Sequence, residues 1–339
     1  MTDLPSIDWH DLGEPQGKGW TNTVRRYDRL PERAHGLVPE IVWDLSRNSN
    51  GLFNRFRTNA TTIRARWTLG LEQLAMPHMP ATSVSGVDLY AEDETGHSRW
   101  VGVGQPETFP HVDVELATGL DAGERIYTIY LPLFNNLERI EIGLPSGSSF
   151  EMLPADDVKP VVYYGTSIIH GASASRSGMA LPSILSRRLG RTVMNLGFSG
   201  NAKMEVELAQ LIGEIDAALY VIDCLPNMDS VQIEERALPF LNALREARPT
   251  TPILLIEDRT FTNAWIMADR RDRHATSRAA LTAAFDARLA LGDTNLHYLE
   301  GASLLGNDDD ATVDSSHPTD LGFVRMADIL TPIFTKLLD

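Results

Sequence analysis

The first 150 residues alternate apolar and polar positions with a period of two. In the stretch TIRARWTL every second residue from Ile63 to Leu69 is apolar, and arginine or threonine lies between them. RIYTIYLPL and RIEIGL repeat the pattern, and turn-forming stretches such as EDETGHS separate such runs. Strict alternation is typical of antiparallel strands with one buried face. Residues 1–150 are therefore predicted to form an all-β sandwich domain of the jelly-roll kind.

The pattern changes after a linker-like stretch at residues 145–160. Short, wholly apolar runs now alternate with longer segments of helical period, which indicates a parallel sheet covered on both faces. A final helix is expected at residues 321–338. We predict a doubly wound α/β domain over residues 158–339. Its expected strands are residues 161–165, 192–198, 218–224, 252–258 and 296–301.

Polar residues follow these strands at the points where the strands end. Ser167 follows the first strand, the stretch NLGFSGN follows the second, and Asn227 follows the third. The stretch VDSSHPTDLG lies just before the last helix. Because the carboxyl ends of parallel strands meet at one edge of a sheet, these residues are expected to converge there.

Asp314 and His317 are three residues apart, and Pro318 follows the histidine. A residue before proline is pushed away from helical geometry, so His317 is expected in an extended turn ahead of the helix. Asp314 can then bind one ring nitrogen and leave the other free to take a proton from Ser167. This combination suits nucleophilic acyl transfer.

Acyl transfer also needs donors for the developing oxyanion. The backbone N–H groups of Ser167 and Gly200 are candidates, together with the side-chain amide of Asn227. Each residue also has a plainer interpretation. Ser167 alone resembles a helix cap, Asn227 a turn former and Gly200 a residue that permits a positive φ.

The four blocks together resemble the SGNH hydrolases, also called GDSL esterases. They are GTS with Ser167, FSGN with Gly200, LPNM with Asn227, and DSSH with Asp314 and His317. The resemblance implies a flavodoxin-like three-layer α/β/α domain, no required metal or cofactor, and ester hydrolysis through an acyl-serine. It makes Ser167 the nucleophile, His317 the base and Asp314 its orienting acid, with Ser167, Gly200 and Asn227 as the oxyanion hole.

Two further stretches bear on this resemblance. SGVDLY at residues 85–90 is similar to the β-sandwich domain that precedes the catalytic domain in one bacterial branch of the family. Thr166 stands where the GDS pattern has aspartate, which leaves the hydrogen bonding of the nucleophile turn as an open question. Other polar residues near strand ends are expected to have structural roles, namely His170, Asn195, Cys224, Glu257 and Asp258.

Composition narrows the classes of partner. Acidic residues outnumber basic ones by 46 to 30, for a formal net charge of −16, which argues against nucleic acid and anionic membranes as partners. Cys224 is the only cysteine, and the N-terminal residues lack the pattern of a signal peptide, so a cytoplasmic location is expected. His35, His78, His97 and His111 do not cluster at metal-ligand spacing. Homo-oligomer formation is left open.

The function expected from these observations is hydrolysis of short acyl esters, in particular acetyl esters, of a polyhydroxylated small molecule. The stretch ASASRSGMA, residues 172–180, is small and polar, and no apolar, lid-like insertion was recognised between residues 160 and 300. A lipase, thioesterase or lactonase with the same triad is the alternative within the class. The alternative from another class is a glycan-binding protein with an inactive hydrolase scaffold.

Overall fold

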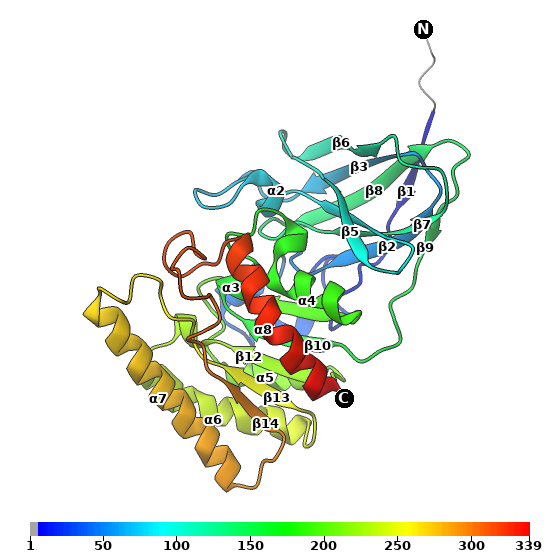
Figure 1. The fold of residues 1–339 in the computed structure, drawn as a ribbon. Coiled ribbons are helices and arrows are strands. Elements are labelled where there is room, and N and C mark those ends of the chain that lie inside the picture. Colours follow the sequence, from blue (N-terminus) through cyan, green and yellow to red (C-terminus); the bar gives the residue numbers. More distant parts are fainter. Residues whose placement is uncertain (1–5) are drawn as a thin grey trace.

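The computed structural model describes residues 6–339, and the first five residues of the predicted N-terminal domain lie outside the described part. Two antiparallel sheets form the first half of the chain, and a parallel sheet between helices forms the second. Figure 1 shows the two halves in contact, with the β-sandwich at the top and the α/β domain below. The predicted fold class is confirmed.

The sandwich is built from a four-stranded and a five-stranded sheet. In spatial order, the first sheet contains β1 (Ile7–Asp11), β8 (Leu137–Pro145), β3 (Thr62–Leu69) and β6 (His111–Thr118). The second contains β5 (Ser98–Val103), β4 (Asp88–Glu92), β7 (Arg125–Tyr130), β2 (Phe53–Thr58) and β9 (Glu151–Met152).

Strand β3 shows why the alternating pattern specifies this layer. It pairs antiparallel with β6 on one side and β8 on the other. Ile63, Ala65, Trp67 and Leu69 are all buried, while the residues between them are partly exposed. The buried face packs with residues of the second sheet, including Phe56, in one hydrophobic cluster. The sandwich therefore has a core of its own.

The segment between β1 and β2 does not belong to that core. It contains a 3-10 turn, η1 (Glu32–Ala34), and a short helix, α1 (Glu40–Leu45). Its side chains Trp20, Val42 and Trp43 are buried in a hydrophobic cluster of the α/β domain. One segment of the predicted N-terminal domain thus packs against the α/β domain. The alternating pattern did not predict this packing.

The α/β domain has a five-stranded parallel sheet in the order β11-β10-β12-β13-β14, the flavodoxin-like order. All five strands occur where the sequence predicts them: β10 (Val161–Gly165), β11 (Val193–Gly197), β12 (Leu219–Asp223), β13 (Ile253–Ile256) and β14 (Leu296–Leu299). The main helices are α4 (Leu181–Leu189), α5 (Val206–Gly213), α6 (Ser230–Ala247), α7 (Ala268–Ala290) and α8 (Asp320–Leu338).

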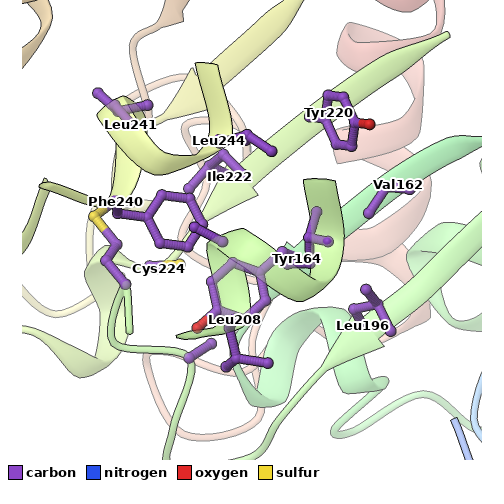
Figure 2. Close-up of a cluster of buried hydrophobic side chains, with 14 of the residues drawn as sticks. Val162, Tyr164, Leu196, Leu208, Tyr220, Ile222, Cys224, Phe240, Leu241 and Leu244 are labelled. Carbon is purple, nitrogen blue, oxygen red and sulfur yellow. The ribbon is translucent and has the colours of Figure 1, made fainter. Parts of the chain in front are cut away.

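Alternate residues of the strands pack against opposite helix layers. On one face, Val162, Tyr164 and Ile222 contact side chains of α5, α6 and α7. Figure 2 shows this cluster, in which Phe240 lies beside Tyr164. On the other face, Val161 and Tyr163 pack with α3 (Ser167–His170), α4 and α8. The sheet is therefore the middle of three layers.

The linker-like stretch is partly ordered into the sandwich, because Glu151 and Met152 form strand β9 against β2. The second sheet thus extends two residues beyond the expected limit of the first domain. Among residues 6–339, no helix is both long and apolar enough to cross a lipid bilayer.

Candidate active site

The turn after β10 positions Ser167. The strand ends at Gly165, where an added Cβ would lie 2.4 Å from Ile169 Cγ1 and 2.9 Å from the Asp223 carbonyl oxygen. Only glycine fits at this close approach. The chain then turns at Thr166 into the single helical turn α3, whose first residue is Ser167. The serine is 7% exposed, at the carboxyl edge of the sheet.

The structure brings Ser167, His317 and Asp314 into one hydrogen-bonded chain. Ser167 Oγ lies 2.8 Å from His317 Nε2, and His317 Nδ1 lies 2.7 Å from Asp314 Oδ2. The carboxylate at Nδ1 favours the tautomer that carries its proton there, so Nε2 is free to accept the serine proton. The arrangement has the geometry of a nucleophile, a base and an orienting acid.

The loop that carries Asp314 and His317 is held by its own backbone. Asp314 Oδ1 accepts hydrogen bonds from the backbone N–H groups of Ser316 (3.1 Å) and His317 (2.8 Å). Ser315, which lies between Asp314 and Ser316, has a φ of +77°, a conformation that non-glycine residues seldom adopt. Val313 N–H donates to the His317 carbonyl (3.0 Å) and closes the loop.

These contacts also set the charge of Asp314. Partial burial acts to raise the pKa of its carboxyl, but the N–H groups of His317 and Ser316 and the His317 ring outweigh burial. The pKa of Asp314 is therefore below its ordinary value, and the carboxylate stays ionised over the neutral range.

The three predicted oxyanion donors lie on loops at the same sheet edge. Ser167 N–H is at the start of α3, and Gly200 lies after β11 with a φ of +69°. Neither N–H donates to another atom of residues 6–339. The amide of Asn227 gives one hydrogen to the Asn201 carbonyl at 2.8 Å, which fixes its orientation and leaves the second hydrogen for another acceptor.

Thr166 keeps the nucleophile turn intact. Its carbonyl accepts from His170 N–H at 3.0 Å, and Gly165 accepts from Phe198 N–H at 2.9 Å. The threonine side chain is fully buried, and its hydroxyl has no hydrogen-bond partner among the described residues. A carboxylate would be unfavourable in that setting, because a buried charge without a partner is costly. Threonine therefore suits the space that it occupies here.

The sandwich half holds the strand that leads to Gly200. Buried Arg29 donates to the carbonyls of Asn195 (3.0 Å) and Gly197 (3.1 Å), which lie at the carboxyl end of β11. Asn50 donates to the Asn195 side chain at 2.9 Å, and Asn195 in turn donates to the Ile169 carbonyl at 2.7 Å. Asn195 is therefore a structural hydrogen-bonding residue, as expected.

The SGVDLY stretch connects the sandwich to the segment after the nucleophile. Buried Asp88 accepts from Arg176 Nη1 at 2.7 Å and from Gly178 N–H at 2.9 Å. The Arg176 guanidinium also lies over the rings of Tyr90 and Trp100, at 5.5 and 5.2 Å. Burial raises the pKa of Asp88, although Arg176 opposes this effect. This ion pair joins the two halves.

His170 lies at the same boundary, not in the hydrogen-bonded chain. It is completely buried, bonds the Leu133 carbonyl through Nε2 at 2.8 Å, and stacks on Phe134 with ring centroids 4.0 Å apart. Burial and the nearby Arg29 charge lower its pKa well below the ordinary value. His170 is therefore neutral and structural.

The other expected structural residues also have structural contacts. Glu257 accepts from Tyr298 Oη (2.7 Å) and Gly301 N–H (2.9 Å), and Asp258 accepts from Arg273 at 2.6 Å. Cys224 is buried in the hydrophobic cluster of Figure 2, where burial raises the pKa of its thiol. Within residues 6–339, no group of three or more His, Cys, Asp or Glu side chains is arranged to hold a metal ion.

One exposed apolar feature of the α/β domain was missed from the sequence. The loop between β13 and α7 contacts the loop that carries Asp314 and His317, because Thr262 N–H donates to the Ser315 carbonyl at 3.0 Å. It exposes Trp265 and Ile266, at 73% and 65%. The expectation from the sequence concerned a strongly apolar, lid-like insertion and did not single out these two exposed side chains. The signal was present in the stretch NAWIM, which follows a strand end.

Comparison with known proteins identifies the class. Residues 158–335 match the GDSL-like lipase/acylhydrolase family, and residues 7–150 match the N-terminal region of SGNH-hydrolase-type esterases. A structure from Bacteroides ovatus, assigned as a GDSL-like lipase, has a TM-score of 0.93 and 32% identity, with 98% of each chain covered. The chain belongs to the GDSL-like lipase/acylhydrolase family and is an SGNH-type ester hydrolase.

More distant structures share the fold. Salicylyl-acyltransferase SsfX3 from a tetracycline biosynthetic pathway has a TM-score of 0.73 and 20% identity, covering 99% of this chain and 96% of its own. A family two carbohydrate esterase from Cellvibrio japonicus has a TM-score of 0.59 and 13% identity, with 99% of each chain covered. No curated protein sequence matches the chain. At these identities the likeness is one of fold alone.

Proposed function

We propose that the protein is a serine esterase that removes a short acyl group, in particular acetyl, from a polyhydroxylated, carbohydrate-like small molecule. The observation that carries the proposal is the chain of two hydrogen bonds from Ser167 to His317 and from His317 to Asp314, at 2.8 and 2.7 Å. The family supplies ester hydrolysis, and this geometry supports Ser167, His317 and Asp314 as the residues that perform it.

The proposed reaction has two halves. Ser167 Oγ attacks the ester carbonyl carbon while its proton passes to His317 Nε2, and the carbonyl oxygen becomes an oxyanion. The N–H groups of Ser167 and Gly200 and the free amide hydrogen of Asn227 stabilise that oxyanion. His317 then protonates the departing alcohol oxygen and leaves an acyl-serine. Water, deprotonated by His317, attacks the acyl carbon, and His317 returns the proton to Ser167 Oγ as the bond to the serine breaks. This releases the carboxylic acid and regenerates the serine hydroxyl.

The segment after the nucleophile supports a small acyl group. Ala172 and Ala174 are buried, and the Ser175 N–H donates to the Asp320 carboxylate at 2.9 Å. Thr82 of the sandwich half donates to the Ser175 carbonyl at 2.7 Å. This segment next to the nucleophile turn is made of small residues and is fixed from both halves, and we infer from it a preference for a short acyl chain. The polyhydroxylated alcohol rests on the family resemblance.

A longer or aromatic acyl group is the second candidate, and the exposed Trp265 and Ile266 favour it. Each buried CH₂ contributes about 0.8 kcal/mol of binding, so an apolar wall would reward a long chain strongly. The loop that carries this pair contacts the loop of Asp314 and His317 through Thr262, so the chain length of the acyl group is the quantity to measure.

Hydrolysis of p-nitrophenyl esters from acetate to dodecanoate tests the proposal, because the leaving group is constant throughout the series. We expect the highest kcat/KM at acetate and a steep fall by octanoate. An optimum at octanoate or longer would overturn the acetylesterase assignment and favour a lipase or thioesterase. The variant Trp265→Ala is the matched control, since it lowers kcat/KM for long chains selectively if this side chain binds them.

A further inference from the structure

A loop of the β-sandwich half reaches the proposed catalytic histidine. After β3 the chain leaves the sheet, and Met76 and Met79 pair through two backbone hydrogen bonds of 2.9 and 3.0 Å before α2 (Ala81–Val84). Figure 1 shows this loop next to α2, on the side of the sandwich that faces the loop leading into α8.

The tip of the loop is anchored on the catalytic domain. Met79 is 2% exposed and lies in the same hydrophobic cluster as Ile168 and Ile169, the residues that follow Ser167 in α3. Pro77 and Pro80 flank the tip, and each fixes its own φ near −65°. The tip is therefore held relative to the element that carries the proposed nucleophile.

This anchoring places His78 against His317. The two imidazole rings have centroids 5.9 Å apart with an angle of 36° between their planes. His317 uses both ring nitrogens, one toward Ser167 and the other toward Asp314. His78 is exposed, and among residues 6–339 neither of its ring nitrogens takes part in a hydrogen bond. A second imidazole with free nitrogens thus stands beside the base.

The chemistry of acyl transfer indicates what His78 would meet. When the tetrahedral intermediate collapses, His317 Nε2 gives its proton to the oxygen of the departing alcohol, which therefore lies within hydrogen-bond reach of that nitrogen. The proposed donors to the other oxygen, on Ser167, Gly200 and Asn227, all belong to the α/β half. A side chain whose ring centroid lies 5.9 Å from that of His317 is therefore close enough to reach the alcohol part of the substrate.

We propose that His78 is a specificity residue that binds the alcohol part of the ester through a hydrogen bond between its imidazole and a hydroxyl near the ester oxygen. The inference rests on the proposed esterase function and extends it to the acceptor. A sugar acetate carries such hydroxyls, whereas a simple alkyl acetate does not. The sandwich half would then take a direct part in choosing the substrate.

The test compares glucose 6-acetate with ethyl acetate, both acetates of primary alcohols, in the wild type and in His78→Ala. Loss of one hydrogen bond of about 1.4 kcal/mol corresponds to a factor of ten. The ratio of kcat/KM for glucose 6-acetate to that for ethyl acetate is therefore expected to fall about tenfold. His78→Gln, which keeps a donor and an acceptor, is expected to recover part of that ratio.

His97→Ala is the matched control, because His97 is a histidine of the sandwich in the turn between β4 and β5, where it contacts Thr95. It is expected to keep the wild-type ratio, and thermal unfolding of each variant reports whether the fold is retained. An unchanged ratio in His78→Ala would overturn the inference while leaving the esterase proposal in place. A wild type that hydrolyses neither acetate would overturn both.

Discussion

The two halves of the chain contribute to one site in different ways. The α/β half supplies Ser167, His317 and Asp314, and its loops carry the three proposed oxyanion donors. The sandwich half supplies none of these groups, yet it binds the backbone around them through Asp88, Arg29 and other buried polar residues. The proposed catalytic groups and the contacts from the other half that hold their backbone are therefore encoded in separate parts of the sequence.

The largest expected effect lies in the α/β half. Ser167→Ala should lower kcat by about 10⁶-fold, the typical cost of removing a nucleophile that acts with a base and an acid. The change removes one oxygen from a strand-end turn, so the circular dichroism spectrum should not change. The measurement is turnover of p-nitrophenyl acetate by purified protein. Ser303→Ala, at an exposed serine of the same domain, is the control, and near-wild-type turnover by Ser167→Ala would refute the assignment.

A smaller loss is expected from Asn227→Ala. Removal of one oxyanion donor typically costs about 10²- to 10³-fold in kcat. Because Asn227 also bonds the Asn201 carbonyl, unfolding in urea has to be measured alongside kcat. Asn242→Ala, an exposed asparagine on α6, should leave kcat unchanged. A rise in KM without a fall in kcat would contradict the oxyanion role.

The support from the sandwich half should appear mainly in stability. Arg176→Ala leaves Asp88 buried without its charged partner, which typically costs about 3 kcal/mol of unfolding free energy. Arg188→Ala is the contrast, because its partner Asp328 is 62% exposed and such surface pairs contribute less than about 1 kcal/mol. Urea unfolding of both variants measures the difference. Equal losses would show that the Asp88–Arg176 pair stabilises the fold no more than an exposed ion pair does.

The smallest effect is a pH dependence of stability from His170. Its pKa is lowered in the folded protein, so below the unfolded value of about 6.5 the unfolded state binds the extra proton and stability falls. As the pH falls from 8 to 5, below the unfolded pKa, this contribution to stability is progressively lost.

His170→Gln removes that titration and can still donate to the Leu133 carbonyl. Unfolding free energies at pH 8 report its packing loss alone, and the wild type should lose more unfolding free energy than the variant on acidification to pH 5. Identical pH profiles for the two proteins would exclude His170 as the source.

The sequence predicted the fold well, because each half follows one period over its length. Alternation such as that from Ile63 to Leu69 determines which face of the strand is buried, because a shift by one residue would expose every apolar side chain. The position of the segment with Trp20 and Trp43 was not predicted, since it has no strand or long helix of its own and packs against the other half.

The candidate site was predicted in part. Ser167, Gly200, Asn227, Asp314 and His317 could be found because parallel strands bring their ends to one edge, and the structure does place them there. Their catalytic roles stay predictions. His78 was not recognised as a neighbour of the site, since it approaches His317 from a loop whose path depends on contacts such as Met79 with α3. Such contacts leave no period in the sequence.

Covalent labelling shows whether Ser167 carries an activated hydroxyl. A fluorophosphonate reacts with a serine only when a base activates its hydroxyl and donors stabilise the charge at phosphorus. Peptide mass spectrometry of the labelled wild type should place one adduct on Ser167, with none in Ser167→Ala and a greatly slowed reaction in His317→Ala. An adduct on any other residue, or a wild type that stays unlabelled while fully folded, would contradict the assignment of Ser167, His317 and Asp314 as the catalytic residues.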